Sequence, residues 1–179
     1  MTNSTDASNN SPLGDEGKTL LLVRHAKSSW EIGTLTDFER PLNDRGIKDA
    51  PAMAKRLKSQ NLHIDAFVSS PAKRAKKTAA FFTEIYKVPA EEIVFISALY
   101  HASAEVFYEV ISALPDHFNT VALFSHNPGI TWFVNSLQAK VNVDNMPTCA
   151  IFAIEADISQ WSGFAKAKIE FLFFDYPKK

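Results

Sequence analysis

Short apolar runs alternate with longer amphipathic segments from Thr19 almost to the end of the chain. A run such as TLLLV at 19–23 is apolar along its whole length, which is typical of a strand covered on both faces. The apolar runs predict strands at 19–23, 64–69, 91–96, 120–125, 149–155 and 168–174. The amphipathic segments predict helices at about 43–60, 70–87 and 103–114, and a fourth that opens at 127–129 and runs to about 137.

This order of elements predicts an α/β fold with three layers, in which a mainly parallel central sheet has helices on both faces. The two consecutive late strands predict an antiparallel edge. Asn43 is expected to cap the first helix, and Pro51 to kink it. Ser70 and Pro71 are expected to be the N-cap and first residue of the second helix.

Composition is that of an ordinary globular chain: 179 residues, 46% hydrophobic and 22% charged, with a formal net charge of −1. A chain of this size can bury one core, so we expect a single domain over residues 18–179. Residues 1–17 are rich in Ser, Asn and Thr and predict a flexible tail. The near-neutral charge disfavours a nucleic-acid partner, because such domains usually carry a clear positive excess.

The single cysteine, Cys149, excludes an internal disulfide framework and a cysteine-cluster zinc site. No apolar run approaches the length of a membrane span, and residues 1–17 lack the features of a signal peptide. These features favour a cytoplasmic protein with no membrane partner, and they leave the oligomeric state open.

Charged and imidazole side chains follow three of the predicted strands. Arg24 and His25 follow the first strand. Arg74 lies near the start of the helix after the second strand, and His126 follows the fourth. A single histidine at a strand end is more often a structural group than a catalyst. Because ligands gather at the carboxyl ends of the strands in open α/β sheets, the four residues together predict one anion site.

Positive charge gathers near the start of the second predicted helix, at Lys73, Arg74, Lys76 and Lys77. This run could be an ordinary solvated face. The helix dipole, however, makes positive charge at this end unfavourable by up to about 1 kcal/mol per group. Backbone amides at a helix start, joined by an arginine, bind anions instead. Helical side chains lean toward the N-terminus, so Arg74 is expected to point at the strand ends.

These groups suit phosphoryl transfer. Arginine forks pair with phosphate oxygens, and a neutral imidazole with a fixed ring is a good nucleophile near neutral pH. A second histidine, if protonated, can donate to a nonbridging oxygen as charge moves. Phosphoryl transfer depends mostly on positioning and charge stabilisation, so no metal or other cofactor is expected. The strand ends carry no carboxylate cluster suited to Mg²⁺, and the chain has no GxxxxGK(S/T) loop.

Four sequence blocks resemble those of the histidine phosphatase (phosphoglycerate mutase-like) superfamily, and in particular its small SixA-type phosphohistidine phosphatases. The blocks are VRHAKS at 23–28, PLNDRGIKDA at 41–50, SSPAKRAKKTA at 69–79 and SHNPG at 125–129. The resemblance implies a mainly parallel sheet flanked by helices, with His25 as the nucleophile that becomes phosphorylated. The substrate-binding residues that it implies are Arg24, Lys27, Ser28, Arg74 and His126.

The leaving group bears on the substrate. Larger members of this family supply a carboxylic acid after the third strand, where this chain offers Glu105 and His101 without a recognisable pattern. Expulsion of an alkoxide benefits from such an acid, whereas an imidazole leaves more readily because its conjugate acid has a pKa of about 6.5. The sequence therefore favours a phosphohistidine protein as substrate. The alternatives are a small-molecule phosphomonoesterase on the same fold and a phosphate-binding module without turnover.

Overall fold

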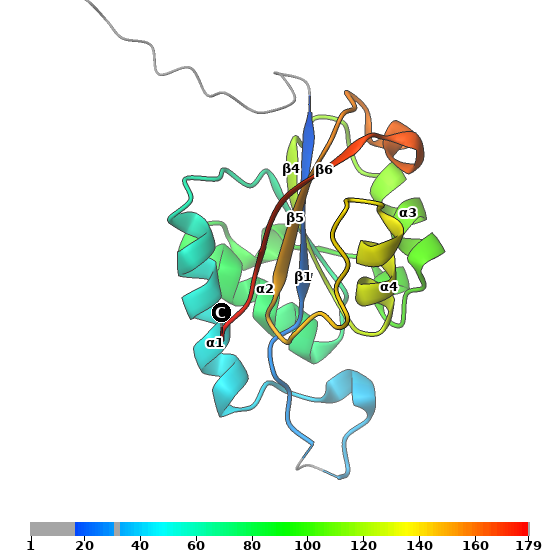
Figure 1. The fold of residues 1–179 in the computed structure, drawn as a ribbon. Coiled ribbons are helices and arrows are strands. Elements are labelled where there is room, and N and C mark those ends of the chain that lie inside the picture. The colour runs from blue at the N-terminus through cyan, green and yellow to red at the C-terminus, as the bar shows by residue number, and fades with distance from the viewer. Residues whose placement is uncertain (1–16, 31–32, 179) are drawn as a thin grey trace, which may run out of the picture.

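One six-stranded sheet forms the centre of the computed structural model, which describes residues 17–30 and 33–178 (Figure 1). The strands are β1 (Lys18–Arg24), β2 (Ala66–Ser69), β3 (Val94–Phe95), β4 (Thr120–Ser125), β5 (Ile151–Ala156) and β6 (Ile169–Asp175). Their order across the sheet is β3-β2-β4-β1-β5-β6. Strands β1 to β4 pair in parallel, and β5 and β6 pair antiparallel. The predicted fold class and its antiparallel edge are confirmed.

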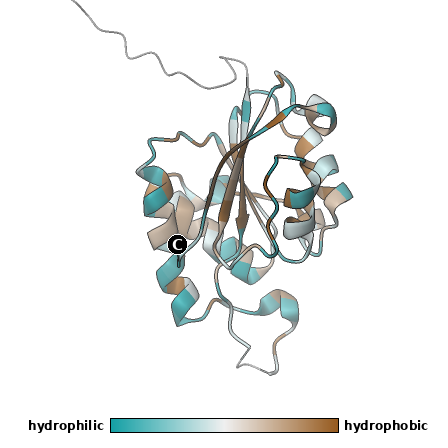
Figure 2. Ribbon diagram, in the orientation of Figure 1, coloured by the Kyte–Doolittle hydropathy of each residue, from teal (hydrophilic) through white to brown (hydrophobic). Residues whose placement is uncertain are grey.

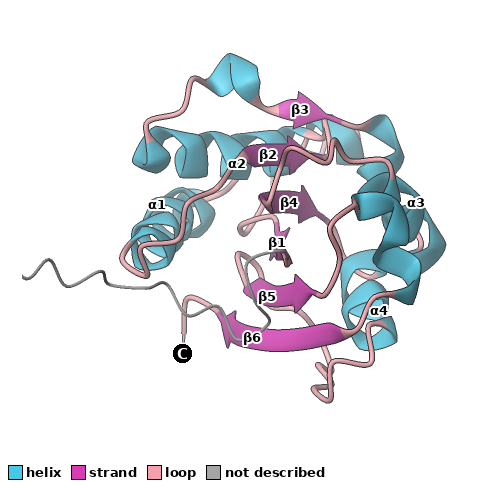
Figure 3. Cartoon of the chain, turned by 90° about the horizontal axis from the view of Figure 1, so that it is seen from above, coloured by secondary structure: helices cyan, strands magenta, loops and turns pink. Residues whose placement is uncertain are grey.

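Helices cover both faces of this sheet (Figures 1 and 3). One face carries α1 (Asp44–Lys58) and α2 (Lys73–Tyr86), and the other carries α3 (Ala104–Ser112) and α4 (Gly129–Ser136). The connections between strands and helices contain four short 3₁₀ turns: η1 (Asp37–Glu39), η2 (Ala90–Glu92), η3 (Ser97–Leu99) and η4 (Trp161–Lys166). Within the described residues, no helix has both the length and the apolar character needed to cross a membrane.

Strand β1 explains its own apolar sequence. Leu20 and Leu22 pack into the core under α3 and α4, whereas Leu21 and Val23 pack into the core under α1 and α2. All four side chains are fully buried, because alternate residues of a strand point to opposite faces. Figure 2 shows the same arrangement, with hydrophobic strands inside and hydrophilic residues on the helices around them.

The first predicted helix start is confirmed and the second is wrong. The Asn43 side chain accepts a hydrogen bond from the Gly46 amide at 3.0 Å and caps α1. Helix α2 begins at Lys73, three residues after the start expected at Ser70. The Ser70 hydroxyl instead accepts from the amide of Ala72 at 3.3 Å and contacts His126, so it serves the loop at the end of β2.

Three predicted strands are shorter than expected, and the first of them, predicted at 64–69, is β2 at Ala66–Ser69. The segment 91–96 contributes only the two residues of β3, because residues 90–92 form a 3₁₀ turn and both β3 residues are exposed at the sheet edge. Cys149, expected in the fifth strand, has a φ of 62° and precedes β5. Pro51 lies inside α1, as the sequence indicated. Apart from Gly17, the expected tail over residues 1–17 lies outside the described residues.

Gly129 of the SHNPG block allows α4 to start close to the loop before α3. A Cβ atom at this position would lie 1.8 Å from the carbonyl oxygen of Ala102, so no other residue fits without movement of the backbone. This close approach holds the end of β4, and with it His126, against the loop that carries His101.

Candidate active site

The predicted site residues lie at the carboxyl ends of three neighbouring strands, β2, β4 and β1. A cavity of about 250 Å³ opens there, lined by Arg24, His25, Lys27, Ser28, Trp30, Asp37, Arg40, Arg74, His101, Asn127 and Thr148. His126 lines an adjoining cavity of about 250 Å³, which shares His101 and Asn127 with the first. The rings of His25 and His126 are 5.0 Å apart between centroids. The structure thus gathers the residues predicted from three separate sequence blocks.

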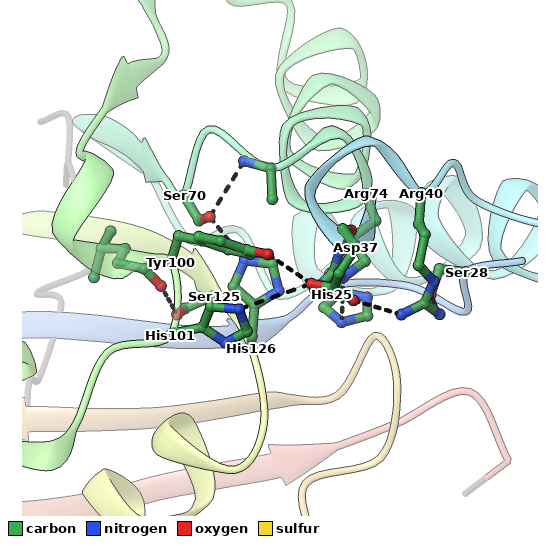
Figure 4. Close-up of polar contacts among 12 residues, drawn as sticks. His25, Ser28, Asp37, Arg40, Ser70, Arg74, Tyr100, His101, Ser125 and His126 are labelled. Carbon is green, nitrogen blue, oxygen red and sulfur yellow. Dashed lines mark hydrogen bonds and ion pairs between the residues drawn. The ribbon is translucent and has the colours of Figure 1, made fainter. Parts of the chain in front are cut away.

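His25 is held in one orientation by two hydrogen bonds. Its Nδ1 lies 2.7 Å from the carbonyl oxygen of Ala26, which can only accept, so Nδ1 carries the ring proton. Its Nε2 is therefore unprotonated, and the lone pair of Nε2 accepts a hydrogen bond from Nε of Arg74 at 3.2 Å (Figure 4). The imidazole is 6% exposed.

The surroundings of His25 keep it neutral. Burial is the largest effect and holds its pKa well below 6.5; the neighbouring His126, Arg74 and Arg24 lower it further, against the hydrogen bond to Ala26. A neutral imidazole with an unprotonated Nε2 directed at a guanidinium is a nucleophile already in its reactive form at neutral pH.

His126 uses its ring nitrogens in the opposite way. Its Nε2 lies 2.7 Å from the hydroxyl oxygen of Ser70. The Ser70 hydroxyl oxygen accepts a hydrogen bond from the Ala72 amide. Among the described residues, Nε2 of His126 is the acceptor that the proton of this hydroxyl can reach. We therefore assign the Ser70 hydroxyl as the donor to Nε2, and with it the imidazole proton to Nδ1.

Burial, and then the charge of Arg74, lower the pKa of His126 to about 3. The protonated form considered from the sequence is therefore not the form present at neutral pH. A neutral ring can still donate through Nδ1, which is buried and has no hydrogen-bond partner among the described residues.

The two arginines carry the positive charge of the cavity. Arg74 is 4% exposed, and its guanidinium donates to the carboxylate of Asp37 at 3.0 Å as well as to His25. Arg24 donates to the carbonyl of Met146 at 2.6 Å, and its buried Nε has no partner among the described residues. Burial, and then the charge of Arg74, lower the pKa of Arg24. An anion between the two guanidiniums would relieve this unfavourable burial of like charge.

Sequence reasoning missed Asp37 and Arg40, which line the cavity, and Tyr100, whose hydroxyl contacts Asp37 (Figure 4). The Asp37 carboxylate accepts from Arg74, from Arg40 at 2.9 Å and from the Tyr100 hydroxyl at 2.7 Å. Burial acts to raise the pKa of Asp37, but these hydrogen bonds outweigh it, and the pKa lies well below its ordinary value. Asp37 is therefore ionised and has no proton to give.

Arg40 and Ser28 line the cavity and contact each other. Arg40 donates to the Ser28 hydroxyl at 2.7 Å and to the Ser29 carbonyl at 3.0 Å. Its guanidinium also stacks on Trp30, 3.2 Å from the ring centroid. Ser28, expected to bind substrate, is thus tied to Arg40. A signal for this segment was present, since Thr36 and Glu39 form a capping box that marks the turn carrying Asp37.

The two acid candidates are placed differently. His101 lines both cavities, with Nε2 3.9 Å from the Asp37 carboxylate. Glu105 lies in the first turn of α3 and lines neither cavity. Its pKa is lowered chiefly by a hydrogen bond with Ser103. In residues 17–30 and 33–178, no three His, Cys, Asp or Glu side chains gather as a metal site would require.

Comparisons with known proteins agree with this geometry. The histidine phosphatase superfamily (branch 1) matches residues 20–94. An uncharacterized chloroplastic protein of Arabidopsis thaliana is 28% identical over 160 residues, which cover 84% of this chain and 72% of the plant protein. An uncharacterized protein of Mycobacterium tuberculosis is 34% identical over 106 residues, 59% of this chain and 63% of that protein. A 2,3-bisphosphoglycerate-dependent phosphoglycerate mutase of Bartonella bacilliformis is 37% identical over 84 residues, which cover 46% of this chain and 41% of the mutase.

Solved structures share the fold along nearly the whole chain. A SixA protein from Nakamurella multipartitia superposes with a TM-score of 0.76 at 21% identity, covering 91% of this chain and 98% of that one. The protein histidine phosphatase SixA complexed with tungstate superposes with a TM-score of 0.75 at 22% identity, covering 89% and 97%. The chain therefore has the fold of these SixA proteins along nearly its whole length, and its residues 20–94 match the histidine phosphatase superfamily.

Proposed function

We propose that this chain is a phosphatase of the histidine phosphatase superfamily, and that it removes the phosphoryl group from phosphohistidine in proteins through a covalent phosphohistidine on His25. The observation that carries the proposal is the position of Nε2 of His25, which is unprotonated and 3.2 Å from the guanidinium of Arg74. A phosphoryl group placed beside that guanidinium would have its phosphorus in front of the attacking nitrogen. Such positioning supplies much of the barrier reduction in phosphoryl transfer.

In the first step, the lone pair of His25 Nε2 attacks phosphorus and the P–N bond of the substrate breaks. The electron pair stays on the substrate imidazole, which leaves as a neutral ring when its other nitrogen carries a proton. Arg74 would release Nε2 of His25 and, with Arg24, would pair with the nonbridging oxygens and offset their charge. His126, whose ring lies 5.0 Å from that of His25, would donate a proton to one of those oxygens.

In the second step, water attacks the phosphorus and the bond to His25 Nε2 breaks. The electron pair returns to Nε2, and the proton lost by water passes to solvent. The products are inorganic phosphate and the enzyme with His25 neutral, the state that its buried surroundings favour.

The protein substrate is supported by the acids of the site. Asp37 is a carboxylate that lines the cavity, and it is ionised and held by Arg74, Arg40 and Tyr100. An ionised carboxylate cannot protonate an alkoxide, whereas an imidazole with a conjugate-acid pKa of about 6.5 needs less help. The single cysteine, Cys149, is a buried free thiol. We propose with the same function that the protein works in a reducing cytoplasm.

A small-molecule phosphomonoesterase is the second candidate, and His101 favours it. This imidazole lines the cavity with its side chain 65% exposed, where it can donate a proton to a departing alkoxide. The match to a phosphoglycerate mutase points the same way.

The two candidates are separated by capture of the intermediate and by substrate choice. Brief incubation with ³²P-labelled phosphohistidine protein, followed by alkaline quench and peptide mapping, should place an acid-labile phosphoryl group on His25. Turnover of that protein should exceed turnover of an alkyl phosphate at equal concentration. Preference for the alkyl phosphate would instead establish the second candidate, and label on any other residue would disprove the assigned nucleophile.

A further inference from the structure

A groove of about 460 Å³ lies beside the active site, between α1 and α2. We call it the docking groove and define it by its lining residues Pro41, Leu42, Ile47, Lys73, Lys76, Lys77 and Ala80. Two of its residues adjoin the catalytic cavity in sequence: Pro41 follows Arg40, and Lys73 precedes Arg74. The docking groove and the catalytic cavity are therefore lined by consecutive residues at two places in the chain.

The floor of the docking groove is apolar. Leu42 is buried, Pro41 and Ala80 are half-buried, and Ile47 is 48% exposed. Two of the lysines also contact aromatic rings: the ammonium group of Lys76 lies 5.3 Å from the ring centroid of Phe95, and that of Lys77 lies 4.7 Å from the ring centroid of Phe81. An apolar floor rimmed by charge is typical of a protein-binding surface.

The rim of the docking groove is positive. Lys73, Lys76 and Lys77 follow the spacing of one helix face, and all three are exposed. In the described part of the chain, none of them lies within 4.0 Å of a carboxylate, and Glu39 is the acid whose pKa the charge of Lys73 lowers. The first turn of α2 contains no acidic residue. Like charges at this spacing, near the positive end of the helix dipole, destabilise a helix, and the ring contacts of Lys76 and Lys77 offset this only in part.

We propose that the docking groove binds an acidic, amphipathic helical segment of the phosphoprotein substrate, next to its phosphohistidine. Leucine-like side chains of that segment would cover Pro41, Leu42 and Ile47, and its carboxylates would pair with the lysine rim. This proposal rests on the proposed function. It assigns a binding site to the part of the substrate that does not fit in the catalytic cavity of about 250 Å³.

Two synthetic peptides test the proposal. Both carry the same phosphohistidine, made with potassium phosphoramidate, followed by a helical segment with Leu at three- and four-residue spacing. One has Glu at the remaining positions and the other has Gln. The unmodified enzyme should hydrolyse the Glu peptide with a kcat/KM about tenfold above that of the Gln peptide, mainly through KM. The variant Lys73→Gln/Lys76→Gln/Lys77→Gln should lose this preference, and its kcat/KM for free phosphohistidine should change less than twofold.

Matched variants complete the test. Lys140→Gln/Lys166→Gln/Lys168→Gln removes three exposed lysines from a different cavity, beside β6, and should keep the preference for the Glu peptide. Ile47→Ser should raise KM for both peptides and leave free phosphohistidine unaffected. Equal kcat/KM for the two peptides, or a preference that survives in the first triple variant, would overturn the docking proposal alone. Failure of the unmodified enzyme on both peptides and on free phosphohistidine would overturn the proposed function, and the docking proposal with it.

Discussion

The ends of β1 and β4 carry the same residue type at neighbouring positions, yet they prepare it for opposite tasks. Each strand delivers a buried, neutral histidine, His25 or His126, to the same edge of the sheet. At the end of β1, a backbone carbonyl holds Nδ1, so Nε2 faces the site as an acceptor. At the end of β4, the Ser70 hydroxyl holds Nε2, so the proton is on Nδ1 and the ring is a donor.

This difference shows that the hydrogen bond at one ring nitrogen decides whether the other ring nitrogen of an imidazole is an acceptor or a donor. A carbonyl can only accept and makes its partner a nucleophile at the other nitrogen, whereas a hydroxyl whose proton is directed at the ring makes it a donor. Burial and the nearby guanidiniums then keep both rings neutral, so each tautomer persists at neutral pH. Four predictions test this contrast, from the largest expected effect to the smallest.

The largest effect is expected at the acceptor ring. His25→Asn removes the nucleophile, so kcat for a phosphohistidine protein should fall by about 10⁴-fold and labelled phosphoenzyme should disappear. Rapid-quench assays measure both quantities. A variant that retains more than a tenth of the rate would show that His25 is not the attacking group.

A smaller loss is expected at the donor ring. His126→Ala removes one hydrogen-bond donor to a phosphoryl oxygen and should lower kcat by about 10²-fold, the usual loss for one such group. Phosphoenzyme on His25 should still form, slowly enough to follow by the same quench method. Complete loss of the intermediate would mean that the contrast between the two rings is wrong and that His126 shares the nucleophilic role.

The group behind the donor ring should matter less again. Ser70→Ala leaves His126 in place but frees its tautomer, so kcat should fall by about tenfold with KM nearly unchanged. Ser69→Ala is the matched control, because this neighbouring serine is equally buried and its hydroxyl donates to the Ser70 carbonyl. Equal losses of kcat in the two variants would assign Ser70 a structural role only. So would a loss of kcat that is proportional to the drop in the thermal unfolding midpoint.

The smallest effect concerns stability. Both rings stay neutral in the folded chain and take up protons on unfolding, so the unfolded state binds more protons below pH 6.5. The free energy of unfolding should therefore fall as the pH drops below about 6.5, and for His126 this fall continues toward pH 3. Urea midpoints at pH 7.5 and 5.0 should differ less in His126→Gln than in the unmodified protein. His63→Gln, whose side chain is 87% exposed, should leave the difference unchanged.

Much of the fold followed from local pattern. The strand predicted at 120–125 matches β4, because a fully buried strand must be apolar along its length. The cap at Asn43 was visible because its partner, the amide of Gly46, is three residues away. The start of α2 was not visible, because the hydroxyl of Ser70 contacts a residue 56 positions along the chain.

The sequence by itself determined the layered fold, the four motif blocks and the strand ends at which Arg24, His25 and His126 lie, because these depend on periodicity and on residues close in the chain. Only the tertiary structure decided the tautomers of the two histidines, the ionised state of Asp37 and the closure of the cavity by Arg40. Protonation depends on burial and on charges brought together across the fold. No local pattern encodes those distances.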